Sequence, residues 1–524
     1  MNDSLLFEKL EQYALSHTRF TASPSSDDDF REQYVQVLNK KGYTEGDFIF
    51  DEYMDLVDTA KYKIEKFIKR CPLSFAIIAL RNDLMRRYFQ YDKRDPDSEI
   101  YTSDVVLFAV IWSSLCGGKT CKEHAQFWFD YNPLLQYLIP GMPSPKWMIS
   151  AETIRFFLKM IPDGEFSSMF KQYFGDKKIK AEELLENIKA ASLDEDEAPQ
   201  IQYRHLVGGD GQELRSSYRK GDHNRKDKGA QRVCCYDCDA RVVLNYILVK
   251  CKNNERNAFM TMLSDMYVPS NCIFYADAIN SSKEMIEYLN RMMMDWIFAI
   301  KNNLSNSVAV VAIKNYLNEH KDTYEYFHCE KVDKTGGRIE VRRYDIIPIS
   351  AVEPCQQALL KPGTKSLIRV EKETYSHLKD DNKNIKEKKM KEAKPTVSTL
   401  YFISSLDYND DNCKQIVHSL RHRWLYESQH NTLDTVMLQD SQHCCDENHL
   451  AAITGLNSMV YNIVSFARQK MSTRGYTNVA HRNADTAKTA PLITYSRVFS
   501  IFKQHPLVAI QYLDEYFNTP PVED

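Results

Sequence analysis

Residues 272–277 read Cys-Ile-Phe-Tyr-Ala-Asp, an apolar run that stops abruptly at an acidic residue. The run has the length and composition of a short buried strand, and Asp277 stands at its end. A second segment, residues 205–211, reads His-Leu-Val-Gly-Gly-Asp-Gly and places Asp210 at the end of another short strand. Acidic residues at the ends of neighbouring strands face one edge of a sheet. The two segments therefore predict an α/β core with a carboxylate site at that edge.

The segments around these two runs form an ordered series of strands and helices. Strands are expected over residues 203–209, 232–237, 241–249, 272–276 and 296–301, and helices over residues 257–266 and 281–294. The order of these elements is three strands, a helix, a strand, a helix and a strand. This is the order of a ribonuclease H-like core. A further strand over residues 399–406 and a long helical pattern over residues 411–437 would complete it. The predicted fold class is mixed α/β, with a β-rich insertion and an all-helical N-terminal domain.

Composition divides the 524 residues into five segments. We expect a helical N-terminal domain, two parts of the core separated by a β-rich insertion with a Lys-rich loop, and a helical tail. In chain order these are residues 1–200, 201–320, 321–398, 399–475 and 476–524.

The overall composition excludes several classes of protein. Hydrophobic residues make up 43% and aromatic residues 12% of the chain, which is too much for a disordered protein. No apolar run reaches the length of a membrane span, and the first residues lack the pattern of a secretory signal. The 13 cysteines are odd in number and scattered, which favours reduced thiols in a cytosol. A net charge of −4 means that nucleic-acid binding must rest on local patches.

A third acidic residue, Glu427, lies in the polar helix over residues 411–437, on one face with Arg423 and Asp434. Carboxylates are the ligands that Mg²⁺ prefers, so two aspartates and a glutamate can hold a pair of ions for phosphodiester chemistry. The glycines around Asp210 would leave room for a phosphate to approach. A simpler interpretation makes Asp210 a turn residue and Glu427 part of a solvated helix face.

Basic residues gather directly after Asp210. They are Arg215, Arg219, Lys220, Arg225, Lys226, Lys228 and Arg232. Such a loop can hold DNA phosphates, although an ordinary solvated loop has the same composition. Cys235 and Cys238 have the spacing of zinc ligands, but no matching second pair is evident.

Several motifs in this order resemble one family. Residues 210–215 read Asp-Gly-Gln-Glu-Leu-Arg and are similar to an Asp-Gly-Lys-x-Leu-Arg motif, while residues 252–255 and 276–278 resemble its Lys-x-Asn-Glu and Ala-Asp-Ala segments. Residues 401–406 and 424–434 resemble the closing strand and the helix that carries a glutamate. Over about residues 100–470 the chain resembles the H-repeat-associated insertion-sequence transposases, a DDE-type group.

The resemblance implies that Asp210, Asp277 and Glu427 form a catalytic triad that binds two Mg²⁺ or Mn²⁺ ions. It also implies that Lys301 and Asn303 contact DNA near the site.

The sequence departs from the family pattern at several positions. Gln212 stands in place of lysine, Leu304 in place of glutamine and Gly336 in place of histidine. Leu420 and Asp434 stand in place of the tyrosine and lysine of a related Tyr-x-x-Arg-x-x-x-Glu-x-x-x-x-x-x-Lys signature, whereas Arg423 fits it.

A transposase of this type would cut and join double-stranded DNA at element ends and at a target, acting as a homodimer on DNA. The N-terminal helices would bind the element ends, and Arg423 with Arg215, Arg219 and Lys220 would position the DNA. Two alternatives remain open at this point. One is a catalytically silent DNA-binding protein derived from a transposase, and the other is a simple nuclease on the same core.

Overall fold

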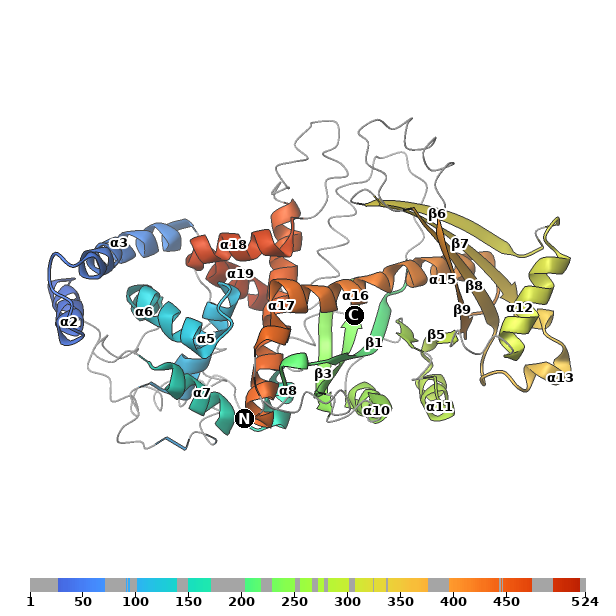
Figure 1. The fold of residues 1–524 in the computed structure, drawn as a ribbon, viewed down its shortest axis with the longest axis horizontal. Coiled ribbons are helices and arrows are strands. Elements are labelled where there is room, and N and C mark those ends of the chain that lie inside the picture. The colour runs from blue at the N-terminus through green and yellow to red at the C-terminus, as the bar shows by residue number, and fades with distance from the viewer. Residues whose placement is uncertain are drawn as a thin grey trace, which may run out of the picture. The chain divides into compact units, whose positions relative to one another are not determined.

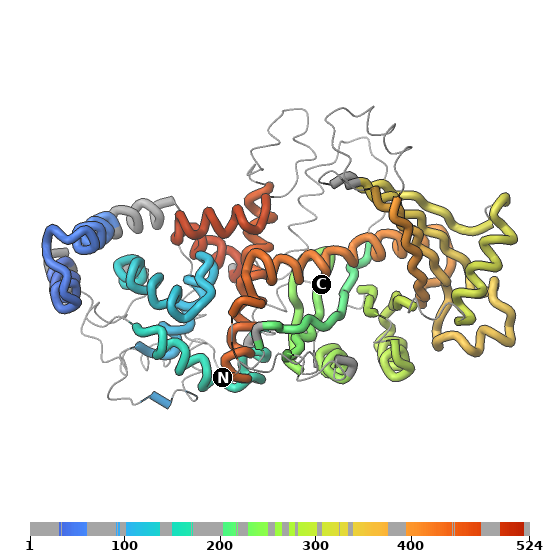
Figure 2. Tube along the Cα trace, in the orientation of Figure 1, coloured from blue at the N-terminus to red at the C-terminus, as the bar shows by residue number. Residues whose placement is uncertain are grey.

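A computed structural model describes the larger part of the chain. The described residues are 27–70, 91, 93–94, 101–138, 149–170, 203–217, 229–249, 255–265, 272–277, 281–300, 307–323, 325–335, 338–375, 395–442, 444, 446–473 and 493–518. Figure 2 traces the chain and draws the remaining residues in grey.

The chain forms two compact units. Unit 1 comprises Met1–Ser192, Glu213–Ala230 and His430–Asp524, and unit 2 comprises Leu193–Gln212 and Gln231–Gln429. Unit 2 therefore occupies two separate stretches of the sequence, and unit 1 occupies three.

One sheet of nine strands runs through the second unit (Figure 1). Its members are β1 (Leu206–Glu213), β2 (Gln231–Asp237), β3 (Val242–Val249), β4 (Ile273–Ala276), β5 (Asp295–Ile300), β6 (Phe327–Thr335), β7 (Arg338–Pro348), β8 (Ser366–Tyr375) and β9 (Thr396–Ser404). Their order in the sheet is β3-β2-β1-β4-β5-β9-β8-β7-β6.

The first five strands have the 3-2-1-4-5 order of a ribonuclease H-like core. β1, β4 and β5 are parallel, so helices must connect them, whereas β2 and β3 form an antiparallel hairpin. Arg241 adopts a positive φ of 57° in the hairpin turn. The backbone N–H of Cys238 donates to the carbonyl of Leu206 at 2.9 Å, which places the end of β2 beside the start of β1. The expected α/β core is therefore present.

The β-rich insertion extends the core sheet. β9 pairs antiparallel with β5, and β8, β7 and β6 follow it in an antiparallel meander. Residues 327–375 thus continue the hydrogen-bonded ladder of the core, whereas the sequence alone predicted only that they would interrupt it.

Helices cover the sheet of unit 2 (Figure 1). They are α10 (Glu255–Asp265), α11 (Lys283–Arg291), α12 (Val308–Glu319), α13 (Pro354–Gln357), α15 (Asp410–His422) and α16 (Trp424–Asn431). α10 contacts β2 and β3, α11 contacts β5, and α12 contacts β8. The pattern over residues 411–437 is two abutting helices followed by a π-helical turn, Thr432–Val436.

Unit 1 is helical. Its main helices are α2 (Asp27–Lys40), α3 (Phe48–Arg70), α5 (Ser103–Leu115), α6 (Cys121–Leu138), α7 (Ala151–Met160), α8 (Asp163–Phe170), α17 (Glu447–Thr473), α18 (Tyr495–Gln504) and α19 (Pro506–Asn518). Ser150 caps α7 by accepting a hydrogen bond from the N–H of Thr153.

Helix α17 forms the centre of unit 1. It contacts α5, α7, α8, α18 and α19, and its apolar side chains are buried on all sides. Its length and composition would suffice to cross a membrane, but 94% of its most apolar stretch is buried inside the protein. This burial is that of a core helix. The core segment expected over residues 399–475 therefore contributes to both units, because α17 packs among the helices of unit 1.

Candidate active site

Parallel pairing of β1 and β4 brings the two aspartates together. Gly209 pairs with Ala276 in the ladder, and Asp210 and Asp277 are the next residues along the two strands. Neighbouring strands lie about 4.8 Å apart, so both residues occupy the same edge of the sheet. The pairing of β1 with β4 ends just before Asp210, whereas β1 itself continues to Glu213.

The glycines before Asp210 allow protein side chains to pack closely on β1. A Cβ on Gly208 would lie 3.0 Å from Cδ2 of Tyr426, and a Cβ on Gly209 would lie 2.5 Å from Cε1 of Phe259. The room that we expected for a phosphate at these two positions is therefore filled by α16 and α10.

Tyr426 fixes the helix that carries Glu427. Its side chain is buried, and its hydroxyl lies 3.2 Å from the carbonyl oxygen of Asp210 and 3.1 Å from that of Cys234. The Cys234 thiol lies 3.0 Å from the same hydroxyl. α16 is thus held against β1 at Asp210 itself, and the next residue in the helix is Glu427.

The charges of the acidic residues affect the pKa values of Glu427 and Tyr275. Burial raises the pKa of Glu427 above its usual value, the charges of Arg423 and Lys372 lower it, and the charge of Asp277 raises it. Burial likewise raises the pKa of Tyr275, and the charges of both Asp277 and Asp210 add to that rise. Each acid therefore acts electrostatically on Tyr275 or on another acid.

Arg423 lies beside these acids in an aromatic setting. Its Nη1 donates to the Tyr275 hydroxyl at 2.8 Å, and this hydroxyl in turn donates to Oδ1 of Asp277 at 3.4 Å. The guanidinium lies 5.8, 5.7 and 5.1 Å from the ring centres of Tyr275, Phe402 and Trp424, within the range of cation–π contacts. The expected position of Arg423 near the acidic cluster agrees with this geometry.

Lys372 is a charged neighbour that the sequence does not reveal. It lies on β8, its ammonium is 4.5 Å from the centre of the Trp424 ring, and its charge lowers the pKa of Glu427. In the related signature a lysine follows the glutamate, but this chain has Asp434 at that position. Lys372 of the β-rich insertion instead places a lysine near Glu427. Only the pairing of β8 with β9 could have indicated this, and that pairing has no local sequence signal.

The remaining predicted DNA-binding residues fall into two groups. Arg215 is exposed in the short 3₁₀ turn Arg215–Ser217, where its N–H donates to Asp440 at 3.1 Å. Arg219, Lys220, Lys301 and Asn303 lie outside the described residues.

One residue of the basic stretch is placed differently from the prediction. Arg232 is fully buried in strand β2 and is therefore not part of a solvated basic loop.

The acidic edge fits divalent cations. It offers oxygen ligands from two adjacent strands and one helix, and the charge of Asp277 disfavours the ionised form of Glu427, a repulsion that a cation would relieve. Within the described part of the chain, the groups of three ligands whose atoms all lie within 4.8 Å of one another are elsewhere, at Asp239. Asp210, Asp277 and Glu427 are not among those groups.

The strand order and this acidic edge define a ribonuclease H-like domain. Residues 206–463 match the family described as transposase DDE domain.

Two further similarities accompany the family match. Over 263 residues the chain is 23% identical to the protein designated YbfL from Escherichia coli strain K12. The matched region covers 50% of this chain and 64% of that relative. The chain thus matches less than two thirds of the relative's length. A piggyBac transposase synaptic complex with hairpin DNA aligns with 85% of this chain and 84% of its own, at 9% identity and a TM-score of 0.32. This score is too low to bear on the fold, which rests on the strand order.

Proposed function

We propose that the protein is a transposase that cuts double-stranded DNA at the ends of an insertion sequence and joins those ends to a target. The observation that supports this most directly is the pairing of Gly209 with Ala276, because it sets Asp210 beside Asp277 within a transposase DDE domain. Glu427 then follows Tyr426, whose hydroxyl contacts the carbonyl of Asp210.

In this proposal Asp210, Asp277 and Glu427 would together hold two Mg²⁺ or Mn²⁺ ions. When bound, such ions supply Lewis acidity at the scissile phosphate and make a nearby water or 3′-hydroxyl more acidic. Arg423 presents its positive charge beside the acids, where negative charge develops on the phosphate. Tyr275 holds Arg423 in place through the hydrogen bond at 2.8 Å.

Two ends must be held together for joining, so a homodimer on DNA is part of the proposal. The helices of unit 1 would bind the element ends, and the basic residues that include Arg215, Arg219 and Lys220 would bind phosphates.

The test replaces each acid by its isosteric amide. Asp210→Asn, Asp277→Asn and Glu427→Gln should each lower Mg²⁺-dependent cleavage of end-containing DNA by at least about 10²-fold, because each removes a charged metal ligand. DNA binding, measured by gel shift without metal, should stay unchanged. The exposed Asp411→Asn variant, in the same unit, should cleave as the wild type does.

The products of the same assay separate the alternatives. Paired end DNA with a target plasmid should yield joined products. Cutting without joining would indicate a simple nuclease, and binding without cutting would indicate a silent DNA-binding protein. Full cleavage by all three amide variants would contradict the assignment of the triad.

A further inference from the structure

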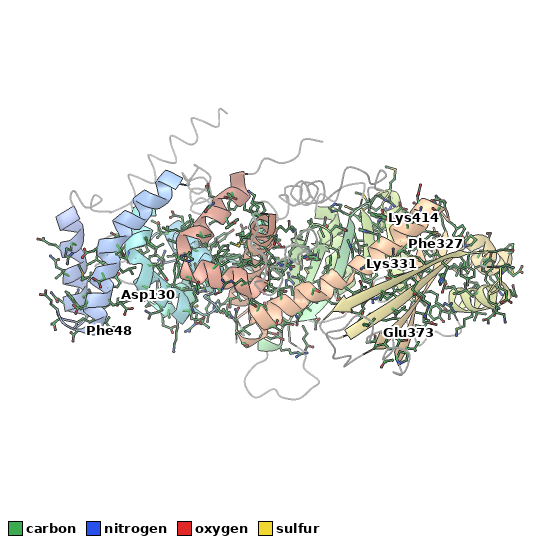
Figure 3. All side chains as sticks on the ribbon, turned by 90° about the horizontal axis from the view of Figure 1, so that it is seen from above. Phe48, Asp130, Phe327, Lys331, Glu373 and Lys414 are labelled. Atoms are coloured by element: carbon green, nitrogen blue, oxygen red, sulfur yellow. The ribbon has the colours of Figure 1, made fainter. Side chains whose placement is uncertain are left out.

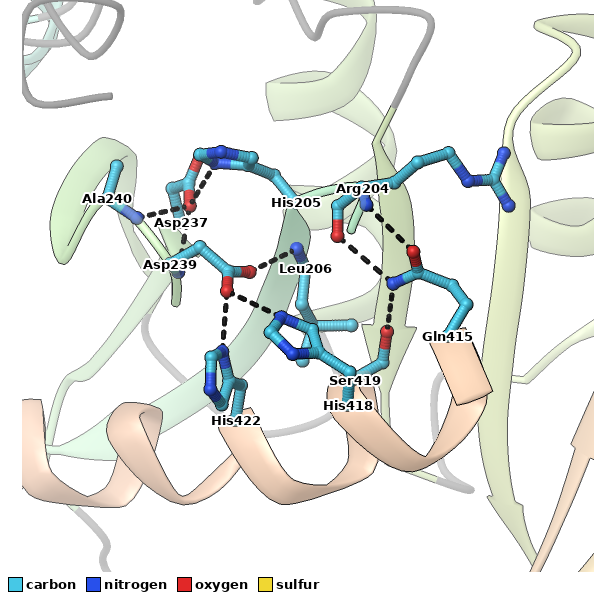
Figure 4. A network of polar contacts seen from close by, with 10 residues as sticks. All are labelled: Arg204, His205, Leu206, Asp237, Asp239, Ala240, Gln415, His418, Ser419 and His422. Atoms are coloured by element: carbon cyan, nitrogen blue, oxygen red, sulfur yellow. Dashed lines mark hydrogen bonds and ion pairs between the residues drawn. The ribbon is translucent and has the colours of Figure 1, made fainter. Parts of the chain in front are cut away.

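A second cluster of metal-ligating side chains lies at the start of β1 (Figure 4). Asp239 stands in the turn between β2 and β3, and its Oδ2 accepts a hydrogen bond from the N–H of Leu206 at 2.8 Å. His418 and His422 lie one turn apart on α15 and point at the same carboxylate. The cluster is separate from the acidic triad, because Leu206 begins β1 and Asp210 lies where its pairing with β4 ends.

The three candidate ligand atoms of Asp239, His418 and His422 lie close together. Nε2 of His418 lies 3.0 Å from Oδ1 of Asp239, and Nδ1 of His422 lies 2.5 Å from the same oxygen. The three ligand atoms all lie within 4.8 Å of one another. The two imidazole rings are 3.9 Å apart, centre to centre. A transition-metal ion about 2.0–2.2 Å from each ligand atom would hold those atoms roughly 3.3–3.6 Å apart, so it would replace the two hydrogen bonds after a small movement of the side chains.

The types of ligand favour zinc over magnesium. Two histidines four residues apart on one helix face form a common pair of zinc ligands, and a carboxylate is a usual third. Imidazole nitrogen is a poor ligand for Mg²⁺, which takes oxygen. The acidic triad offers oxygen alone, so the two sites would select different ions.

A second layer of contacts holds Asp239 in position. His205 contacts the buried Asp237 at 3.0 Å, and Asp237 accepts hydrogen bonds from the N–H groups of Asp239 and Ala240 at 3.0 and 2.9 Å. Metal ligands in proteins are typically oriented by such outer hydrogen bonds. The turn is therefore rigid where the carboxylate meets the two histidines.

The two histidines also face a cavity. His418 and His422 line a cavity of about 370 Å³, together with Tyr203 and Cys329. Figure 3 labels three further lining residues, Phe327, Lys331 and Lys414. The ring of Tyr203 stacks on that of His418 with centres 4.2 Å apart, which fixes the orientation of this imidazole. Water in the cavity could complete a tetrahedral shell around an ion held by three protein ligands.

We propose that Asp239, His418 and His422 bind one zinc ion, which fastens α15 to the turn between β2 and β3. α15 ends at His422, Arg423 keeps helical angles, and α16 begins at Trp424. An ion at His422 thus anchors the helical run five residues before Glu427. The proposal does not depend on DNA cleavage, because it concerns how this run is anchored.

Gln415 on the same helix allows a variant that stays folded. Its side chain accepts from the N–H of Arg204 at 2.7 Å and donates to the carbonyl of Arg204 at 3.1 Å, so α15 keeps an attachment without metal. The double variant His418→Gln, His422→Asn places amide N–H groups near Nε2 and Nδ1. These groups preserve hydrogen bonds to Asp239 and remove both imidazole ligands.

The experiment measures zinc in the purified full-length chain by mass spectrometry after dialysis against a weak chelator. The wild type should retain about one zinc ion per chain, and the double variant should lose it. Added Zn²⁺ should raise the melting temperature of the metal-stripped wild type but not that of the double variant. His328→Asn is the matched control, because His328 contacts Asp345 at 2.7 Å through the same Nδ1 atom. This control should keep its zinc.

Cobalt substitution tests which ligands are involved. Co²⁺ bound by nitrogen and oxygen should give visible d–d bands without the intense near-ultraviolet band of thiolate ligation. A thiolate band would place the metal on cysteines and overturn the proposal. Equal zinc content in the wild type and the double variant would also overturn the proposal. So would a metal-stripped wild type whose melting temperature does not change when Zn²⁺ is added.

Discussion

Gly209 has no room for one more carbon atom. A Cβ at this position would lie 2.5 Å from Cε1 and 3.0 Å from Cδ1 of the buried Phe259 ring. Gly209→Ala should therefore lower the free energy of unfolding by about 1–3 kcal/mol, the usual cost of overpacking a core. Urea denaturation of the purified protein measures this change.

Two further variants show whether the Phe259 contact is the cause. Phe259→Leu in the Gly209→Ala background should recover part of the lost stability, because the smaller side chain frees the space. Gly164→Ala is the control, since nothing lies within 4 Å of its added Cβ in helix α8. This helical substitution should be neutral or stabilise by up to about 1 kcal/mol. An equal loss in Gly164→Ala would mean that any added methyl group destabilises the chain.

At the scale of elements, one buried hydroxyl links α16 to β1 by hydrogen bonds. Tyr426→Phe removes the group that bridges the carbonyls of Asp210 and Cys234, and leaves them without that partner. We expect a loss of stability of about 1–3 kcal/mol. Cleavage should fall further than stability explains, because the helix that carries Glu427 loses its attachment at Asp210. Urea denaturation and Mg²⁺-dependent cleavage, measured on the same sample, check this.

Tyr344 provides the matching control. It is buried in β7, and its hydroxyl has no hydrogen-bond partner among the described residues. Tyr344→Phe should leave stability unchanged or raise it, because a buried polar group without a partner is removed. If both variants lost the same stability, the hydrogen bonds of Tyr426 would not be what holds α16.

Elements with a strong local pattern could be predicted from the sequence. The hairpin over residues 231–249 and the strand that ends before Asp277 correspond to runs of apolar and β-branched residues, and Ser150 marks the start of α7. The position of Glu427 in a second, abutting helix agrees with the polar pattern around it.

Features that depend on distant pairing could not be predicted. The ladder from β5 through β9 to β8 joins segments far apart in the sequence, so nothing local places Lys372 near Glu427. α17 is buried on nearly all sides and carries buried polar as well as apolar residues, so its pattern does not say which helices surround it. The metal-ligand cluster at Asp239 was missed for the same reason, although the four-residue spacing of His418 and His422 is a signal that could have been noticed.

At the scale of the whole molecule, DNA affinity should depend on salt, because the chain is acidic overall and would bind DNA through local basic patches. The net charge is −4, and the basic residues after Asp210 are the densest such patch before the Lys-rich segment. Replacing Arg215, Arg219 and Lys220 by serine should reduce the slope of log affinity against log salt by about 0.9 for each DNA phosphate that the variant no longer neutralises. Fluorescence anisotropy with labelled end DNA between low and physiological salt measures the slope.

A control set changes the charge equally at another place. Lys283, Arg291 and Lys321 are exposed on the helices of unit 2 and their ends. Replacing these three by serine should leave the slope unchanged. Equal slopes for both triple variants and the wild type would remove the stretch after Asp210 from the DNA-binding surface.

The division of unit 1 into separate stretches of sequence has a consequence during synthesis. Helices α5, α7 and α8 pack on α17, which leaves the ribosome only after all of unit 2 has been made. At about 5–20 residues per second, the wait between α8 and α17 lasts roughly 15–55 s. Throughout that time the apolar faces of the early helices lack their partner, so the nascent chain is an expected client of ribosome-associated chaperones.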